Sequence, residues 1–235
     1  MTFSNIISKV YFLTKTNVTS FPTADLTILA NNAMERVVSL IIRADNHWQW
    51  DDTTQPTTDQ GDGTGGLPIA TTALVANQQD YTFATSHLEI SRVELKDTSG
   101  NWRLLTPIDQ HDIKTSLTDY MKTAGQPVRY DKIGASILLY PKPDYSQAAS
   151  LKVWFTRPPI YFAVSDTTKA PGFNTLYHDL VPLWISYDYA MANALPNANQ
   201  LMVEIVRKEE ELLSGYDKRS KDEQKIIRPV NRSSR

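Results

Sequence analysis

The chain has 235 residues, no cysteine and a formal net charge of −2. Without cysteine it has no disulfide, no thiolate zinc site and no thiol nucleophile. Hydrophobic residues make up 41% of the chain, as in ordinary globular proteins, and no window approaches the roughly 18 consecutive apolar residues that indicate a membrane span.

The N-terminal segment Met1 to Val10 contains an apolar run but neither the basic start nor the cleavage site of a secretory signal, so we expect cytosolic synthesis. The first predicted helix spans Thr23 to Asp45. Pro22 lies just outside it, and Thr23 or Asp25 is expected to cap its first turn. Three- and four-residue spacing places one apolar set on a single helical face: Leu26, Leu29, Ala30, Ala33, Val37, Leu40, Ile41 and Ala44.

A polar, glycine-rich stretch follows at residues 51–66, with the sequence DDTTQPTTDQGDGTGG. Its aspartate spacing differs from that of a calcium loop, and the terminal glutamate of that motif is missing. We therefore predict a flexible surface loop without a metal. Trp48 and Trp50, just before it, are expected to wedge the helix against the following unit rather than to stack on bases or sugars.

Residues 67–160 are predicted to form an inserted β domain. Short β-branched or aromatic runs are separated by turn residues, which is typical of a small antiparallel sandwich or barrel. One short helix, Asp109 to Tyr120, is expected to interrupt it. The predicted strands are Tyr81 to Phe83, Ile90 to Leu95, Trp102 to Leu105, Pro127 to Tyr130, Ile137 to Tyr140 and Leu151 to Phe155.

The next predicted helix, Leu180 to Leu195, is apolar on nearly every side, which indicates burial on all sides. The neighbouring helices can cover two of its sides, and a second subunit could cover the rest. Its candidate core or subunit-interface residues are Leu183, Trp184, Tyr187, Tyr189, Met191 and Leu195.

A last predicted helix starts after Asn197, which we expect to cap it together with Gln200. Gly215 is expected to weaken or end this helix. The helices at the two ends of the chain should pack together. The predicted fold is therefore α+β, with a helical bundle from residues 1–50 and 170–217 and the inserted domain between them.

The last segment, residues 218–235, is a basic tail broken by proline. It has seven basic and two acidic residues, a net charge of +5 that leaves −7 for the rest of the chain. A charged arm with too few apolar residues to fold alone is expected to become ordered on a partner. A protein groove suits it better than a polyanion, because the rest of the chain is acidic. Its candidate docking residues are Lys218, Arg219, Lys221, Lys225, Ile226, Ile227, Arg228, Pro229, Val230, Arg232 and Arg235.

No catalytic, metal or cofactor site is expected. The histidines at positions 47, 87, 111 and 178 lack ligand spacing, and phosphate-loop, dinucleotide and nucleophile-elbow motifs are absent. Asp51–Asp52 and Glu209–Glu211 fit solvated charge better than acid–base pairs. A hydrolase whose carboxylates come from distant strands stays open as an alternative.

One motif spans two predicted strands, with GQPVRY at residues 125–130 followed by ILLYPKP at 137–143. It resembles a GxPxxY…LyPxP pattern of tailed-bacteriophage virion proteins. The order of elements up to Arg219 is also similar. Together these features resemble the head-to-tail adaptor proteins, also called connector or tail-accessory proteins, of tailed phages. Further matching segments are 67–72, 79–83, 171–173, 178–195 and 197–218.

This resemblance implies a structural protein without enzymatic activity. It would form a homo-oligomeric ring, commonly of 12 copies, below the portal protein, with the helical bundle as ring body and the C-terminal extension against the portal. A downstream tail protein, such as a tail tube or nozzle, would be the other partner, and packaged DNA would pass through the channel. The expected location is the head–tail junction of a virion assembled in the host bacterial cytoplasm. Another tail component (tail tube, stopper or β-sandwich receptor-binding module) and a cell-wall hydrolase are the alternatives.

Overall fold

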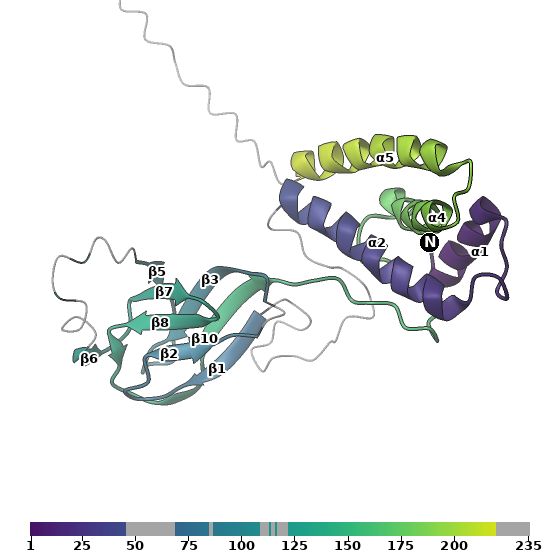
Figure 1. Cartoon of the computed structure of the whole chain (residues 1–235). Helices are drawn as coiled ribbons and strands as arrows, with labels where there is room; N and C mark the ends of the chain where they lie inside the picture. Colours follow the sequence, from purple (N-terminus) through teal and green to yellow (C-terminus); the bar gives the residue numbers. More distant parts are fainter. Residues whose placement is uncertain (46–68, 85–86, 109–112, 114–115, 117–121, 220–235) are drawn as a thin grey trace, which may run out of the picture.

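The fold is α+β, with helices from both ends of the chain and strands from its middle (Figure 1). The structure is a computed structural model that describes residues 1–45, 69–84, 87–108, 113, 116 and 122–219. The predicted loop at 51–66, Trp48, Trp50 and nearly all of the predicted helix at 109–120 lie outside these ranges. So does the tail beyond Arg219.

The described residues form four α-helices and one short 3-10 helix: α1 (Phe3–Thr14), α2 (Thr23–Ala44), η2 (Thr175–Tyr177), α4 (Leu180–Ala192) and α5 (Ala198–Arg219). Two expectations are corrected. α5 continues through Gly215, and α2 begins after Pro22 with no side-chain cap. Asn197 directs its side-chain amide to the carbonyl oxygen of Leu13, 3.3 Å away.

The sequence did not predict α1. Its buried residues Phe3, Ile6 and Val10 have helical spacing, and the Thr2 hydroxyl accepts a hydrogen bond from the backbone amide of Asn5 at 3.4 Å. This cap satisfies one of the free amide groups at the helix start. α1 therefore adds a third helix against α4.

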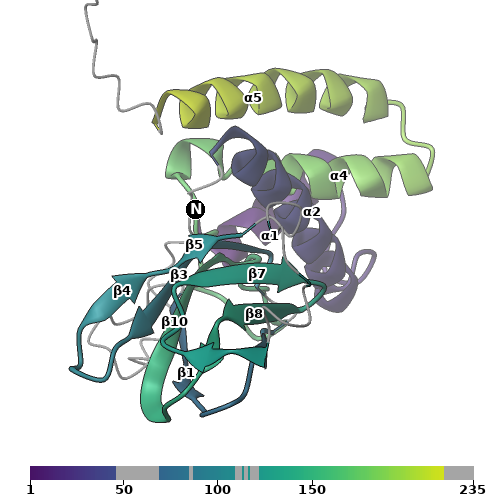
Figure 2. The ribbon, with the colours of Figure 1, turned by 90° about the vertical axis from the view of Figure 1, so that its left-hand side faces the viewer.

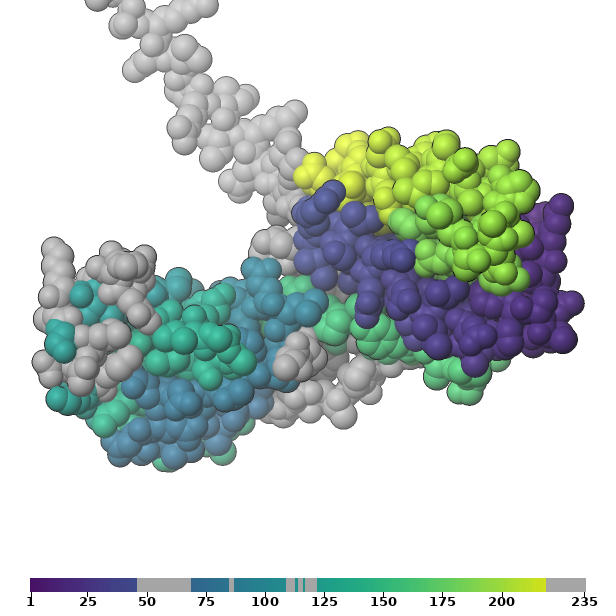
Figure 3. All heavy atoms as spheres, in the orientation of Figure 1, coloured from purple at the N-terminus to yellow at the C-terminus, as the bar shows by residue number. Residues whose placement is uncertain are grey.

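α4 lies among the three other helices and packs against each of them (Figure 2). Its buried side chains join those of α1, α2 and α5 in one core, which contains Ile6, Met34, Ile41, Ile185 and Ile205. The apolar surface on most of its length is thus covered within the chain. In the space-filling view, α1 (purple) and α5 (yellow) occupy different margins of this helical unit (Figure 3).

The strands form two four-stranded sheets and one small pair. The first sheet is antiparallel, in the order β1 (Ile69–Leu74), β10 (Gln147–Thr156), β3 (Glu89–Lys96) and β4 (Trp102–Leu104). The second has the order β2 (Asp80–Thr82), β8 (Ser136–Tyr140), β7 (Arg129–Ile133) and β5 (Thr106–Pro107). The small pair is β6 (Ala124–Gly125) with β9 (Lys142–Pro143).

Both sheets contribute to one apolar core, in which Val93, Leu151 and Val153 of the first sheet meet Ile137 and Leu139 of the second. This is a sandwich, as the alternating pattern predicted. It is not wholly antiparallel, because β5–β7 and β6–β9 pair in parallel.

A connecting segment leads from β10 back to the helices and is fastened to α1 and α2. Asn31 exchanges two hydrogen bonds with the backbone of Phe162, at 2.8 and 3.1 Å. The Phe162 ring stacks on Phe3 at a centroid distance of 4.3 Å. The Tyr161 hydroxyl donates to the Glu35 carboxylate at 2.6 Å. These contacts fix the point where the chain re-enters the helical unit.

Candidate docking surface

The basic tail leaves the described structure at the end of α5, which includes Lys218 and Arg219 of the predicted docking residues. The other nine lie outside the described residues. The last turns of α5 are anchored by Tyr216, which is 2% exposed. Its hydroxyl accepts a hydrogen bond from the backbone amide of Asn174 at 3.0 Å. The tail therefore begins from a fixed position.

Tyr177 forms the other half of this anchor. Its ring lies 5.8 Å from that of Tyr216, and its hydroxyl donates to the carbonyl oxygen of Glu211 at 3.4 Å. A β-carbon on Gly215 would come within 2.0 Å of this hydroxyl. Gly215 is thus required for the close approach of Tyr177 to α5. The unexpected glycine in a strong helix pattern was the only sequence signal of this contact.

His178 belongs to the same region but has a structural role. It is 2% exposed, and its Nε2 atom lies 2.8 Å from the carbonyl oxygen of Phe173. Its Nδ1 atom lies 2.9 Å from the amino group of Met1. The imidazole therefore ties the start of α1 to the segment before α4.

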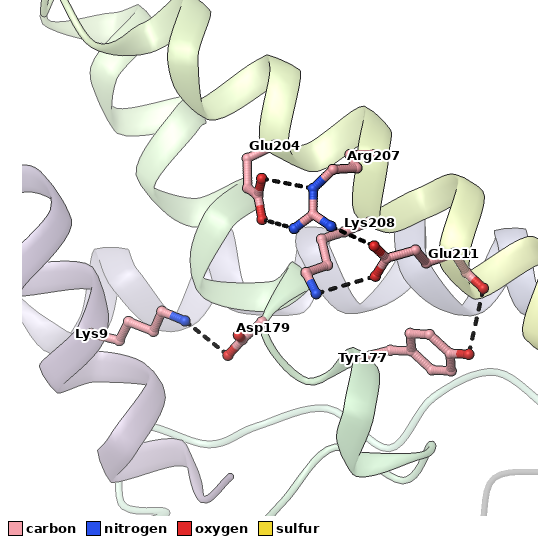
Figure 4. A network of polar contacts seen from close by, with 7 residues as sticks. All are labelled: Lys9, Tyr177, Asp179, Glu204, Arg207, Lys208 and Glu211. Carbon is pink, nitrogen blue, oxygen red and sulfur yellow. Dashed lines mark hydrogen bonds and ion pairs between the residues drawn. The ribbon is translucent and has the colours of Figure 1, made fainter.

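A charged network covers the side of α5 that faces Tyr177 (Figure 4). Arg207 bridges Glu204 and Glu211, with nitrogen–oxygen distances of 2.5 Å to each carboxylate. Lys208 contacts Glu211 at 3.2 Å. The hydrogen bond from Arg207 lowers the pKa of Glu204. The two positive and two negative side chains of this exposed network pair with each other, so together they carry no net charge.

The carboxylates of residues 209–211 were interpreted together as solvated charge, but they differ. Glu209 accepts a hydrogen bond from the Trp184 indole at 3.1 Å, and burial raises the pKa of its carboxyl. Glu211 belongs to the charged network, and Glu210 is exposed. Of the three, only Glu210 fits the interpretation fully.

The predicted interface residues of α4 are mostly packed within the chain. Leu183 is 7% exposed, and Leu195 packs against the helical core. Tyr189 stacks on Phe21 at 4.5 Å, and Tyr187 meets the edge of Trp184 at 5.7 Å. Arg36 lies 4.5 Å above the Trp184 ring. Met191 is the exception, with 56% of its surface exposed.

The β unit has a cavity of about 170 Å³ between β1 and β2, which the sequence did not indicate. Tyr81, Ile137 and Leu151 line it together with His87. The His87 ring stacks on Phe155 at 3.7 Å, and burial lowers its pKa. The lining is mainly apolar, with the hydroxyl groups of Thr71, Thr72, Tyr81 and Thr82 among it.

Within the described ranges, no three His, Asp or Glu side chains are grouped so that they could hold a metal ion. In the same ranges, no helix combines the length and the hydropathy needed to cross a bilayer.

The model of the SU10 adaptor protein family matches residues 1–224, which include all the described helices and strands. The chain belongs to this family. It is a family of phage head-to-tail adaptors, so the resemblance found in the sequence is confirmed at the level of the family. The match also covers α1, which lies before the start of that resemblance. Among curated proteins, none matches the chain at a significant level.

Proposed function

We propose that this member of the SU10 adaptor family forms a ring below the portal and joins the DNA-filled capsid to the tail. The observation that carries the proposal is the family match across residues 1–224. The partners are the portal protein, a downstream tail tube or nozzle protein, and further copies of the chain, commonly 12 in all. The protein would act at the head–tail junction of a virion assembled in the host bacterial cytoplasm.

In this proposal the helical unit is the ring body, and the β unit extends away from it (Figure 1). The α1–α5 core suits a ring body because it is continuous and rigidly packed. Residues 1–45 and 170–217 contain six basic and ten acidic residues. This negative charge disfavours tight binding to DNA phosphates, as a DNA channel requires.

The tail would insert into an acidic groove of the portal. Its positive charge would steer the encounter and fix the register, and Ile226, Ile227, Pro229 and Val230 would supply the apolar anchors. The fixed end of α5 supports this role, because Tyr216 and Tyr177 hold the start of the tail in one place. A fixed starting point lowers the entropy that the arm would lose on docking.

Deletion of residues 218–235 tests the docking step. We expect the truncated chain to keep its helical circular-dichroism spectrum and to lose binding to purified portal rings in co-sedimentation. Wild-type protein should produce an added ring layer below the portal in electron micrographs. Full-affinity assembly of the truncated chain on portals would refute docking through the tail.

A matched variant separates charge from apolar contact. Replacing Ile226, Ile227 and Val230 by serine keeps every basic residue of the tail. We expect this variant to associate with portal rings only at low salt, because screening removes the remaining electrostatic attraction. Unchanged binding at high salt would show that these three residues are not the anchors.

A further inference from the structure

The outward face of α1 ends in a large exposed apolar side chain. Phe12 is 81% exposed, and Lys15, one turn later, is exposed as well. Residues 1–22 contain Lys9 and Lys15 but no acidic residue. Lys9 is paired with Asp179 at 2.8 Å, so Lys15 is the charge beside Phe12. We call Phe12 and Lys15 the α1 patch; it is apolar and basic.

α5 has an outward face of the opposite charge. Val203 and Val206 are 71% and 43% exposed and lie next to each other at three-residue spacing. Glu210, one turn after Val206, is exposed. The nearby Arg207 is held by Glu204 and Glu211. We call Val203, Val206 and Glu210 the α5 patch; it is apolar and acidic.

α1, which carries the first patch, and α5, which carries the second, lie at different margins of the helical unit (Figure 3). A closed ring needs this arrangement, because each subunit presents one surface to its neighbour on one side and a different surface on the other. Both patches are apolar, and their charges are opposite. Because they lie on different helices of one chain, the partner that each one suits is the other patch on a second copy.

We propose that the α1 patch of one copy packs on the α5 patch of the next. Phe12 would lie between Val203 and Val206, and Lys15 would pair with Glu210. This inference rests on the proposed ring and names its contact. The patches are small, so each contact is weak alone. Copies held side by side on a portal gain effective concentration and can close the ring.

The absence of cysteine allows a direct test by disulfide crosslinking. A chain with Phe12→Cys and Val206→Cys is assembled on portal rings, oxidised and separated on a non-reducing gel. We expect a ladder of multimers. The matched control combines Phe12→Cys with Ile28→Cys, since Ile28 is 60% exposed on α2. We expect no ladder from the control pair.

The outcomes separate the contact from the function. If micrographs show rings but the 12/206 pair gives no ladder, or the control pair gives an equal one, the contact is wrong and the ring stands. If no ring forms on portals with wild-type protein, both the contact and the proposed function are refuted.

Charge reversal tests the polar part of the contact. We expect Lys15→Glu to weaken ring assembly about fivefold per contact, the upper range for an exposed pair. Adding Glu210→Lys in the same chain should restore assembly, because every contact then holds the reversed pair. Failure of this rescue would refute the pairing of Lys15 with Glu210.

Discussion

The hydroxyl of Tyr177 occupies the space that a β-carbon on Gly215 would need, at 2.0 Å from its position. The two residues join the segment before α4 to the last turns of α5. Tyr177 thereby helps to fix the point from which the basic tail departs. A residue that looks like a helix breaker in the sequence is instead a packing requirement of a distant aromatic ring.

Gly215→Ala is expected to destabilise the helical unit. Alanine favours a helix over glycine by about 1 kcal/mol, but overpacking against Tyr177 costs about 1–3 kcal/mol. We therefore expect a net loss in thermal or urea unfolding. Ser214→Ala, on the exposed neighbour, is the control and should leave stability nearly unchanged. A higher melting temperature for Gly215→Ala would mean that Tyr177 does not pack there.

Asn31→Ala should loosen the connecting segment from α2. The change removes both hydrogen bonds to Phe162 and leaves partly buried backbone groups without these partners, at a cost of about 1–3 kcal/mol. The effect is measured by chemical unfolding and by faster amide exchange at Phe162. Asn32→Ala, on the exposed side of the same helix, should have little effect on either. Equal effects of the two changes would contradict the role of Asn31.

Trp102→Leu is expected to destabilise the β unit. Lys152 is only 6% exposed and places its ammonium 4.1 Å above the Trp102 ring, with Lys96 at 5.1 Å. Losing the aromatic face removes a cation–π interaction worth about 1–2 kcal/mol for a desolvated cation. Trp102→Phe should restore part of the loss. Leu104→Ala, on the same strand and 53% exposed, is the control and should be close to neutral.

The parts of the fold that the sequence predicted are those with local patterns. The spacing of Leu26, Ala30 and Val37 identified α2, and strand alternation identified the sandwich. α1 was missed because the apolar residues Ile7, Tyr11 and Phe12 lie outside its buried stripe and hide the helical spacing. A helix this short depends on tertiary packing, here against α4, which the sequence does not show. The parallel pairs β5–β7 and β6–β9 join segments far apart in the chain, which alternation cannot reveal.

The docking surface could be predicted only in part, because its anchor joins residues that are far apart in the sequence. The composition of residues 218–235 indicated a segment that needs a partner. Its anchor did not appear in any local pattern, since Tyr216 and Tyr177 meet only after α5 folds back beside the segment at 173–178. The suggestion that a second subunit could cover part of α4 arose because the third neighbouring helix, α1, was not predicted.

Glu209→Gln is expected to stabilise the helical unit at neutral pH. Burial raises the pKa of Glu209 in the folded state, although Trp184, Arg36 and Arg43 partly offset this effect. For a carboxyl with a raised pKa, the folded state binds more protons than the unfolded state, so stability falls as pH rises from the unfolded towards the folded pKa. Glutamine can still accept the hydrogen bond from the Trp184 indole.

The gain should be less than about 1 kcal/mol, because the carboxyl is only partly buried and solvent screens it. Melting temperatures measured from pH 4 to pH 8 check the sign. The advantage of Glu209→Gln over wild type should be largest at the high end of this pH range and should shrink as wild-type Glu209 becomes protonated. Glu210→Gln is the matched control, since that neighbour is exposed. An advantage that grows as pH falls would show that ionised Glu209 stabilises the fold.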